Sequence, residues 1–465
     1  MSRIHLGYFT AALALLGSLV LVGCVGTPKP SERAARADLR AVEARFRPSV
    51  TNAMPALTAQ SSLEDLLNYA MLNRPQVAAA YLDWAASVER ITVERSLPDP
   101  QLTFQMDLQS VVTSLMPGLM MEFPGPGKLA ARADLASAES STKYFAFENA
   151  VLQAAFDVKK AYYQLHFIED KIRINRGMSN LVEGLEEIAR QQNDVGKGTL
   201  QDVLRAQIEQ DQIANDLANL TDSRNPLLAQ LKGALGLSGA APAPPVPLRF
   251  ETTPLDLSSD QIFATALLRN PRLRAMEAEV RLAQAGIAVA EKSRVPDYAV
   301  GVEADAQATP AMVRPRGGMT LPIWRDKIAA EIASAQNRKS AAEARFSAEQ
   351  IAMAVDFADK LFSFRENTRT ITLIEERVLP KARMSLEVAR AAYLSSKTDF
   401  LNLIDAQRAL LGFELTAVEA RLQRELVLAE ISLLVLGLPP AQAPLLNADP
   451  DPIQLPNRSV VTSHE

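Results

Sequence analysis

The chain has 465 residues, of which 48% are hydrophobic and 22% are charged, and this composition is typical of a folded protein. A formal net charge of −5, without any Lys/Arg run, argues against a nucleic-acid-binding surface. The three histidines are far apart, and no glycine-rich phosphate loop is present. We therefore expect neither an enzyme nor a metal site.

The N-terminal segment has the pattern of a bacterial lipoprotein signal. Arg3 precedes an apolar run at 6–22, which is typical of a signal peptide covering 1–23. The sequence Leu-Val-Gly-Cys, ending at Cys24, matches the lipobox, whose cysteine receives a diacylglycerol and an N-acyl lipid. The alternative is an ordinary signal peptide with an incidental cysteine. Val25, in place of an aspartate, favours the outer membrane.

Proline positions divide the next part of the chain. Residues 24–60 contain four prolines among charged residues, and we expect them to form a lipid-anchored extended tether. Ser62, followed by two acidic residues in the expected first turn, indicates a helix start. This helix is expected to end before Pro75, and a second helix to span about 76–96.

The hydrophobic period changes to that of a β-strand after the second helix. Even positions from 102 to 108 are apolar, and the odd positions between them are polar, which predicts a strand at about 98–109. A shorter alternation predicts a partner strand at about 118–123, after a turn at Pro117 and Gly118. Both strands should therefore have one apolar face and one polar face.

A long helical hairpin is expected at about 128–237. No proline occurs in the first 65 or so residues, enough for a helix of about 100 Å at 1.5 Å per residue. Glycines at 196 and 198 indicate a turn between its two helices. Residues 239–257 are proline-rich and are expected to be a linker.

The same pattern then recurs, which predicts a tandem duplication with repeats at 61–238 and 258–438. The matching motifs include Asn73-Arg74-Pro75 with Arg269-Asn270-Pro271, Pro98-Asp99 with Pro296-Asp297, and 197–207 with 397–407. The second repeat should contain strands at about 297–307 and 316–323, and a helical hairpin at about 327–437 with a joint near Pro380. The proline-rich tail spans 439–465.

Four strands are too few to close a barrel, since small barrels need about eight. Three chains would supply twelve strands with apolar residues facing lipid and polar residues facing water. A soluble sandwich that buries the apolar face is the alternative. The alanine-rich long helices allow close packing, so that several copies could form a hollow cylinder.

The order of lipobox, helix pair, strand pair, long hairpin and linker, followed by a second copy, resembles the TolC family of outer-membrane efflux proteins. The resemblance covers roughly residues 61–438, and the stretch from Phe123 to Lys128 is similar to the heavy-metal efflux branch. It implies a mainly α-helical homotrimer with a small β part, a twelve-stranded outer-membrane β-barrel and a periplasmic α-helical barrel. It also implies a passive duct that exports small toxic solutes or metal ions, opened by a periplasmic adaptor and an inner-membrane pump of the resistance-nodulation-division type.

Two other functions stay open at this point. One is a lipid-anchored periplasmic structural or adaptor coiled coil, which predicts helices without membrane strands. The other is a type I protein secretion duct, because the sequence does not identify the cargo. In either case the protein would need no cofactor apart from the lipid on Cys24.

The resemblance assigns roles to the duplicated stretches, which would lie at the periplasmic mouth. Asp405 matches an acid of the aperture, Asn402 replaces a second acid, and Asp399 lies one turn earlier. Asp202 and Tyr393 match a pair that bonds in the closed state. The residues of the adaptor-docking turns would be Val195, Gly196, Lys197, Ser395, Ser396 and Lys397, with Ser396 where a glycine is usual.

Three methionines also allow a thioether copper site to be considered: Met116, Met120 and Met121. Met121 is expected on the apolar face of its strand, which favours lipid contact or packing over metal binding.

Overall fold

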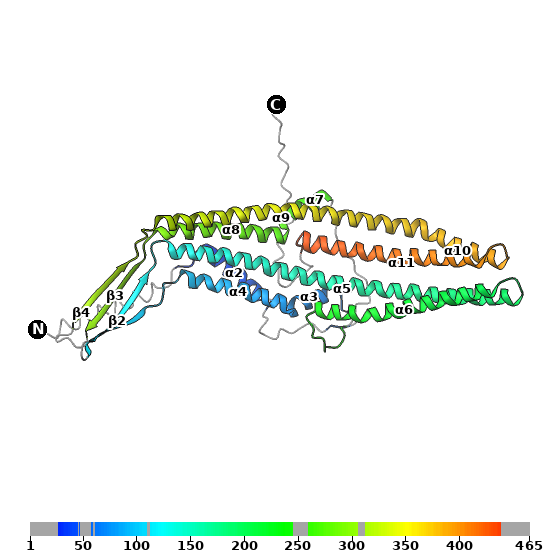
Figure 1. Cartoon of the computed structure of the whole chain (residues 1–465), viewed down its shortest axis with the longest axis horizontal. Coiled ribbons are helices and arrows are strands. Elements are labelled where there is room, and N and C mark those ends of the chain that lie inside the picture. Colours follow the sequence, from blue (N-terminus) through cyan, green and yellow to red (C-terminus); the bar gives the residue numbers. More distant parts are fainter. Residues whose placement is uncertain are drawn as a thin grey trace, which may run out of the picture. The chain divides into compact units, whose positions relative to one another are not determined.

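The computed structural model describes residues 27–44, 46, 57–58, 61–108, 112–244, 259–305 and 312–438. Cys24, the predicted signal peptide and the tail lie outside these ranges, as does the part of the linker from residue 245. The fold is mainly helical with one small antiparallel sheet (Figure 1), which confirms the coarse fold class predicted from the sequence. Within the described ranges, no helix combines the length and the apolar character that a membrane-spanning helix needs.

The helices are α2 (Pro30–Glu43), α3 (Leu63–Asn73), α4 (Pro75–Arg95), α5 (Lys128–Asp194), α6 (Leu200–Ala234), α7 (Ser259–Arg269), α8 (Pro271–Glu291), α9 (Arg325–Leu373), α10 (Leu379–Leu394) and α11 (Phe400–Glu430). The strands are β1 (Gln101–Leu108), β2 (Val112–Phe123), β3 (Tyr298–Asp305) and β4 (Met312–Met319). A short 3₁₀ segment (Lys292–Arg294) follows α8, and π-helical segments (Ile374–Val378 and Ile431–Val435) follow α9 and α11.

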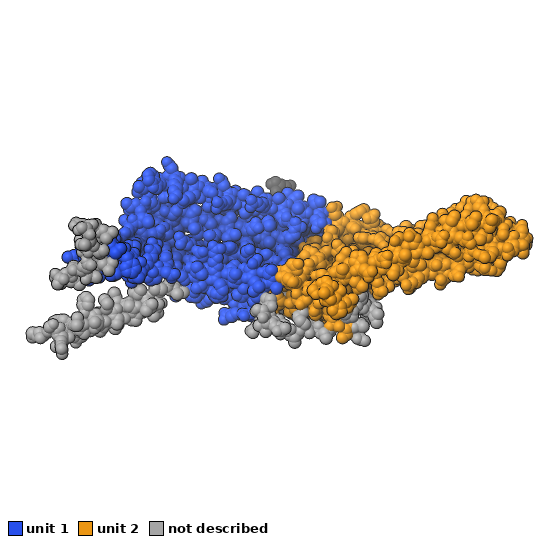
Figure 2. All heavy atoms as spheres, turned by 60° about the horizontal axis from the view of Figure 1, so that its bottom comes forward, with its two compact units in different colours: residues 1–43, 78–150, 260–357 blue, residues 44–77, 151–259, 358–465 orange. Residues whose placement is uncertain are grey.

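The chain forms two compact units, coloured blue and orange in Figure 2. The first comprises Met1–Glu43, Ala78–Ala150 and Asp260–Phe357, and it contains the sheet. The second comprises Ala44–Val77, Val151–Ser259 and Ala358–Glu465, and it contains the turns between α5 and α6 and between α10 and α11.

The strands follow one another in the order β1-β2-β3-β4, and every pair is antiparallel. One row of paired residues runs across the sheet from Leu102 through Leu119 and Val302 to Pro315. Leu102, Leu119 and Val302 are 65%, 50% and 45% exposed, so this apolar face is uncovered in the single chain. On the opposite face, Glu303 is only 4% exposed and forms an ion pair with Arg316 at 2.8 Å.

Two sequence expectations for the strands were wrong. Pro117 and Gly118 do not form a turn but lie within β2, which begins at Val112. Pairing of β2 with β3 starts at Gly118, so Pro117 has a partner strand on one side only and its missing N–H is tolerated there. Gly118 is required by close packing, because a Cβ there would lie 2.5 Å from the Glu303 Cγ.

The fourth strand also differs from its predicted bounds of 316–323. It ends at Met319, and the Thr320 N–H donates to the Asp297 carbonyl at 2.9 Å. Pro322 cannot donate to a strand ladder, so the alternation of apolar residues beyond Met319 continues without strand pairing.

The extended tether predicted for residues 24–60 is contradicted by α2, which spans Pro30–Glu43. Alanine and arginine are strong helix formers, and several of them lie in this segment. Their helix propensity outweighs the effect of the prolines on which the expectation of an extended chain was based. Ala35 of α2 packs against a buried cluster that Ile91 of α4 forms with Ala133 and Ala136 of α5.

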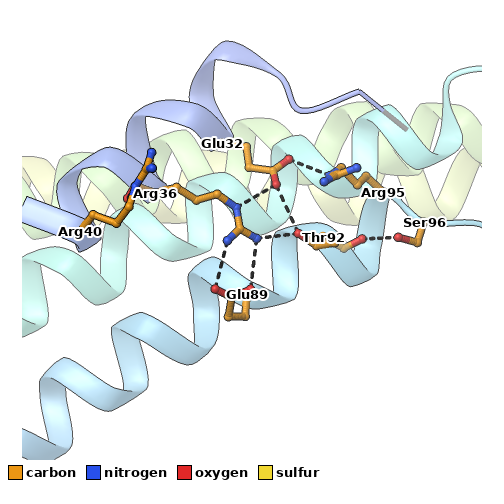
Figure 3. Close-up of polar contacts among 7 residues, drawn as sticks. All are labelled: Glu32, Arg36, Arg40, Glu89, Thr92, Arg95 and Ser96. Carbon is orange, nitrogen blue, oxygen red and sulfur yellow. Dashed lines mark hydrogen bonds and ion pairs between the residues drawn. The ribbon is translucent and has the colours of Figure 1, made fainter. Parts of the chain in front are cut away.

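A buried ion pair network also holds α2 in place (Figure 3). Glu32 is 1% exposed and contacts Arg36 Nε at 3.1 Å and Arg95 Nε at 2.9 Å. Arg36 extends the network to Glu89 at 3.0 Å and to Thr92 at 2.6 Å. A buried carboxylate needs such partners, and they tie α2 to α4 within the first unit.

Helix starts follow local capping chemistry. Ser62 caps α3 as predicted: its hydroxyl accepts from the Asp65 N–H at 3.1 Å, and the Asp65 carboxylate accepts from the Ser62 N–H at 2.8 Å. Asn270 caps α8 in front of Pro271. Pro380 lies in the first turn of α10, directly after the π-helical segment, and such segments accommodate a missing backbone donor.

Candidate functional site at the two hairpin turns

Two helical hairpins of the second unit end in turns with the same backbone geometry. Between α5 and α6, the Lys197 N–H donates to the Gln192 carbonyl at 2.8 Å. Between α10 and α11, the Lys397 N–H donates to the Ala392 carbonyl, also at 2.8 Å. The six residues that the sequence suggested for docking, at 195–197 and 395–397, are all exposed.

Both turns need one residue with a left-handed backbone conformation. Gly196 supplies it in the first turn with a φ of 73°, and Ser396 supplies it in the second with a φ of 56°. A non-glycine residue carries steric strain in this region. The matching hydrogen bonds show that Ser396 does not open the second turn, and the surrounding hairpin holds it in the strained conformation.

The three residues predicted for the aperture lie at or near the start of α11, and all three are exposed. Asp399 precedes the helix and makes no side-chain capping bond. The Asn402 amide donates to the Thr398 hydroxyl at 2.7 Å, so it is a local partner of the turn. Asp405 lies one turn before Arg408, whose pKa is raised mainly by its hydrogen bond to Glu209 and to a smaller extent by the charge of Asp405.

The predicted latch residues come together within one chain. Tyr393 is 5% exposed, and its ring packs edge-on against Phe400 with centroids 5.2 Å apart. Burial, and next the nearby Asp202 carboxylate, raise the pKa of Tyr393 to about 12. Within the described residues the hydroxyl makes no hydrogen bond of regular distance and angle, so the contact with Asp202 is loose and mainly electrostatic.

Asp202 has a second role that fixes its position. Its carboxylate accepts from the Thr199 N–H at 3.1 Å, and the Thr199 hydroxyl accepts from the Asp202 N–H at 3.3 Å. This capping box starts α6. The Asp202 carboxylate, held in the first turn of α6, therefore lies near the buried phenol of Tyr393 on the other hairpin.

The two hairpins share a hydrophobic core behind these turns. It combines buried residues of α5, α6, α10 and α11, namely Met178, Val182, Leu185, Ala189, Val203, Ala206, Ile213, Ala382, Leu386, Tyr393, Phe400, Leu403, Ile404 and Leu410. Tyr393 is thus part of a packed interface, and movement of one hairpin against the other must disturb it.

Sequence reasoning missed two residues of this interface. Glu209 of α6 is 4% exposed and accepts a hydrogen bond from Arg408 Nε at 2.8 Å. It also forms an ion pair with Arg408 Nη2 at 2.6 Å, and both contacts tie α6 to α11. Gln407 is fully buried, and neither of its amide atoms has a hydrogen-bond partner in the described part of the chain. The matching stretches 197–207 and 397–407 both end in Ala-Gln, which marks the position of Gln407 but gives no sign of its burial.

The methionines do not form a cluster. Met116 and Met120 lie on one face of β2, and Met121 lies on the other because faces alternate along a strand. Met116 is buried with its sulfur 3.6 Å from Arg314 Nη1. Among the residues that the structure describes, no group of three His, Cys, Asp or Glu side chains could hold a metal ion.

Comparison with known proteins identifies related chains and structures. The chain is 22% identical over 366 residues to the cobalt-zinc-cadmium resistance protein CzcC of Cupriavidus metallidurans, a match that covers 75% of this chain and 84% of the relative. It superposes on CusC, described as forming a transmembrane channel, with a TM-score of 0.70 and 16% identity, covering 84% of this chain and 96% of CusC. The open state of the Neisseria gonorrhoeae MtrE outer membrane channel matches with a TM-score of 0.66 and 18% identity over 84% and 96% of the two chains.

A family model agrees with these likenesses. The model described as outer membrane efflux protein matches residues 66–237 and 263–435, which together make up more than half of the chain. The resemblance inferred from the sequence is confirmed, and it is a resemblance to transport proteins and not to enzymes. The chain belongs to the outer membrane efflux protein family.

Proposed function

We propose that three copies of this chain form a passive duct that spans the outer membrane and extends into the periplasm. The observation that carries this proposal is the sheet, whose apolar face is exposed and whose opposite face carries paired charges. A four-stranded sheet has two free edges, and closure with two further copies would remove them in a twelve-stranded barrel. The exposed apolar row would then face lipid.

Internal duplication of the chain is part of the same proposal. The family model matches twice, once in each half. Each half contains a helix, two strands and a long helix in the same order, and the two hairpin turns have matching hydrogen bonds. Duplicated halves of this kind would give each chain two nearly equivalent segments of an α-helical barrel. The repeats would be 61–238 and 258–438, with a linker at 239–257.

The hairpin turns would form the periplasmic mouth of the duct. Their residues are exposed and their backbones are closely similar, so an adaptor protein could dock on both by the same contacts. Asp405, with Asn402 and Asp399 nearby, would line the aperture, so that each chain would contribute the start of its α11 to it. The loose contact between Tyr393 and Asp202 would act as a closed-state latch, because it joins the two hairpins and is weak enough to break.

Membership of the efflux family supports the rest of the assignment. The duct would work with a periplasmic adaptor and an inner-membrane pump of the resistance-nodulation-division type, and would be anchored by lipid on Cys24. Its cargo would be small toxic solutes or metal ions, and the name of the relative CzcC supports the metal branch. The sheet weighs against a purely helical periplasmic coiled coil, the rival that predicted no membrane strands.

Conductance measurements in planar bilayers test the aperture. Replacing Asp405 by Ala removes three like charges from the mouth of a trimer, so single-channel conductance should rise and block by divalent cations should weaken. The matched control is Asp211→Ala, which removes an exposed acid farther along α6 and should change neither property. Equal conductance and equal block in wild type and Asp405→Ala would remove Asp405 from the aperture.

A further inference from the structure

A groove in the first unit is lined by residues of α5, α8 and α9 and has a volume of about 1110 Å³. Its lining includes six cationic side chains, Lys128, Arg132, Lys292, Lys327, Arg338 and Arg345, but only two carboxylates, those of Glu279 and Glu331. We call this the cationic groove. None of the residues assigned to the hairpin turns lies in it.

Most of these cations are not neutralised by ion pairs. Lys128 contacts Asp297 at 2.8 Å, and Lys327 lies 3.9 Å from Glu331. The other four form no ion pair within the described ranges. Arg338 and Arg345 are exposed and lie two helical turns apart on one face of α9, about 10 Å from each other along the axis. Such a row of free guanidinium groups attracts anions and binds carboxylate, sulfonate or phosphate groups.

The floor of the groove is apolar and open. Leu135 of α5 and Leu282 and Val289 of α8 line it together with small residues, among them Gly286. A Cβ added at Gly286 would meet no atom within 4 Å. The groove therefore combines room for an apolar body with a cationic rim, and its size suits a drug-sized molecule.

The groove lies on the side of α5 opposite α2. Lys29, just before α2, contacts the Ala130 carbonyl at 3.2 Å and Asp134 at 2.6 Å. Ala35 of α2 packs against the buried cluster that contains Ala133. At 3.6 residues per turn, Arg132 points about 160° away from Ala130. If α5 forms part of the wall of the duct, α2 covers one of its faces, and the face with the cationic groove is left in contact with the solutes that pass.

From these observations we propose that the cationic groove binds amphiphilic organic anions, molecules with an apolar body and a sulfonate, carboxylate or phosphate group. The assignment of the groove to the inner wall of the duct rests on the proposed function and adds a class of cargo to it. It adds a cargo class to the metal ions suggested by the relative's name, since a bare metal cation would be repelled here. Binding itself requires only the geometry of the first unit.

Fluorescence anisotropy with pyranine, a trisulfonated pyrene, tests binding to the full chain in a neutral detergent. Wild type should bind the dye, and added KCl should weaken the binding because it screens the guanidinium charges. Arg338→Gln/Arg345→Gln should lose about tenfold in affinity by removing two exposed charge contacts. Gly286→Phe fills the floor without touching the charges and should bind equally poorly, and its helix should not suffer because glycine is a weak helix former.

Two matched controls separate this site from general effects. Arg33→Gln/Arg40→Gln removes two exposed charges from α2, where Arg40 is drawn in Figure 3, and should bind like wild type. Gly184→Phe places the same large side chain at an open position of α5 in the second unit and should also bind like wild type. Undiminished binding by Arg338→Gln/Arg345→Gln would overturn the proposal.

Two further experiments distinguish a free organic anion from a lipid headgroup and test whether the groove lies in the conduction path of the duct. Addition of phosphatidylglycerol to the micelles should not displace the dye, and full displacement would assign the groove to lipid headgroups instead. In planar bilayers with a KCl gradient, the reversal potential of Arg338→Gln/Arg345→Gln should shift toward cation selectivity. Pyranine binding without any channel activity would refute the duct and leave the site standing, whereas an unchanged reversal potential would remove the groove from the conduction path.

Discussion

Ser396 holds a left-handed backbone conformation in the second hairpin turn, and replacing it by Gly should stabilise that turn. Its φ of 56° is close to the 73° of Gly196 at the matching position. A side chain in this region costs about 1–2 kcal/mol. Glycine costs about 0.5–1 kcal/mol through the greater freedom of the unfolded chain, so the net gain should be about 0.5–1 kcal/mol. The reverse change, Gly196→Ser, should destabilise the first turn by a similar amount.

Hydrogen exchange measured by mass spectrometry reports on this local stability. The amide of Lys397 closes the second turn through its bond to the Ala392 carbonyl, so it exchanges only when the turn opens. Exchange at this amide should slow about two- to fivefold in Ser396→Gly, as expected for about 0.5–1 kcal/mol at a tenfold change per 1.4 kcal/mol. The amide of Lys197 should exchange faster by a similar factor in Gly196→Ser.

Each variant is the other's control, because the unaltered turn in the same chain should keep its wild-type exchange rate. Faster exchange at Lys397 in Ser396→Gly would refute the reasoning. It would mean that contacts of the serine side chain, and not its backbone strain, determine the stability of the turn.

Three further predictions concern the interface between the hairpins. Because the pKa of Tyr393 is raised from 10.0 to about 12, the stability contributed by its neutral form is complete below pH 10 and is lost as the pH rises toward 12. In thermal unfolding, Tyr393→Phe should abolish this loss of stability at alkaline pH, and a phenol that titrates at its ordinary pKa would contradict the prediction. Gln407→Leu should stabilise the hairpins by about 1–2 kcal/mol in urea unfolding by removing a buried amide without partners, whereas Gln207→Leu should destabilise them by about 1 kcal/mol because it removes a bond to Glu186. Arg408→Met should lower the free energy of unfolding by about 1–3 kcal/mol, because it leaves the Glu209 carboxylate buried and unpaired. Adding Glu209→Gln should restore most of that loss, and no recovery in the double variant would show that the ion pair is not the cause.

Much of the fold was accessible from the sequence because long elements have strong periodic patterns. The alternation from 102 to 108 identified β1, and the proline-free stretch from Lys128 identified α5, which ends at Asp194. The capping chemistry of Ser62 located the start of α3. These features depend on neighbouring residues alone, which is why a single sequence reveals them.

Features that depend on distant residues were missed. An extended segment is expected at residues 30–43, but they form α2. Its alanines and arginines favour a helix, and two contacts that no local pattern encodes hold it in place: Glu32 with Arg95, and Ala35 with the buried cluster around Ala133. Pro117 indicates a turn by its residue type, although the limited extent of the β2–β3 pairing accommodates it within a strand. The prolines pointed the wrong way in both cases. Helix-forming residues and tertiary contacts decided the first case, and the pairing of the strands decided the second.

The candidate site was accessible only in part. The repeated stretch predicts both turns, and the resemblance predicts the proximity of Asp202 and Tyr393. The pairing of Glu209 with Arg408 was not foreseen, because the two residues are 199 positions apart. The cationic groove was also not foreseen, since its lining comes from three helices and its charge is diluted in a chain with a formal net charge of −5.

Electron cryomicroscopy of the full chain purified in detergent tests the proposed duct most directly. It should yield particles with threefold symmetry, in which twelve strands close around a continuous axial channel and Leu102, Leu119 and Val302 face the detergent. The hairpin turns around Gly196 and Ser396 should be grouped around the channel axis, with Asp405 of each chain lining the opening. A monomer, or an assembly that buries the apolar face of the sheet between protein layers, would contradict the account.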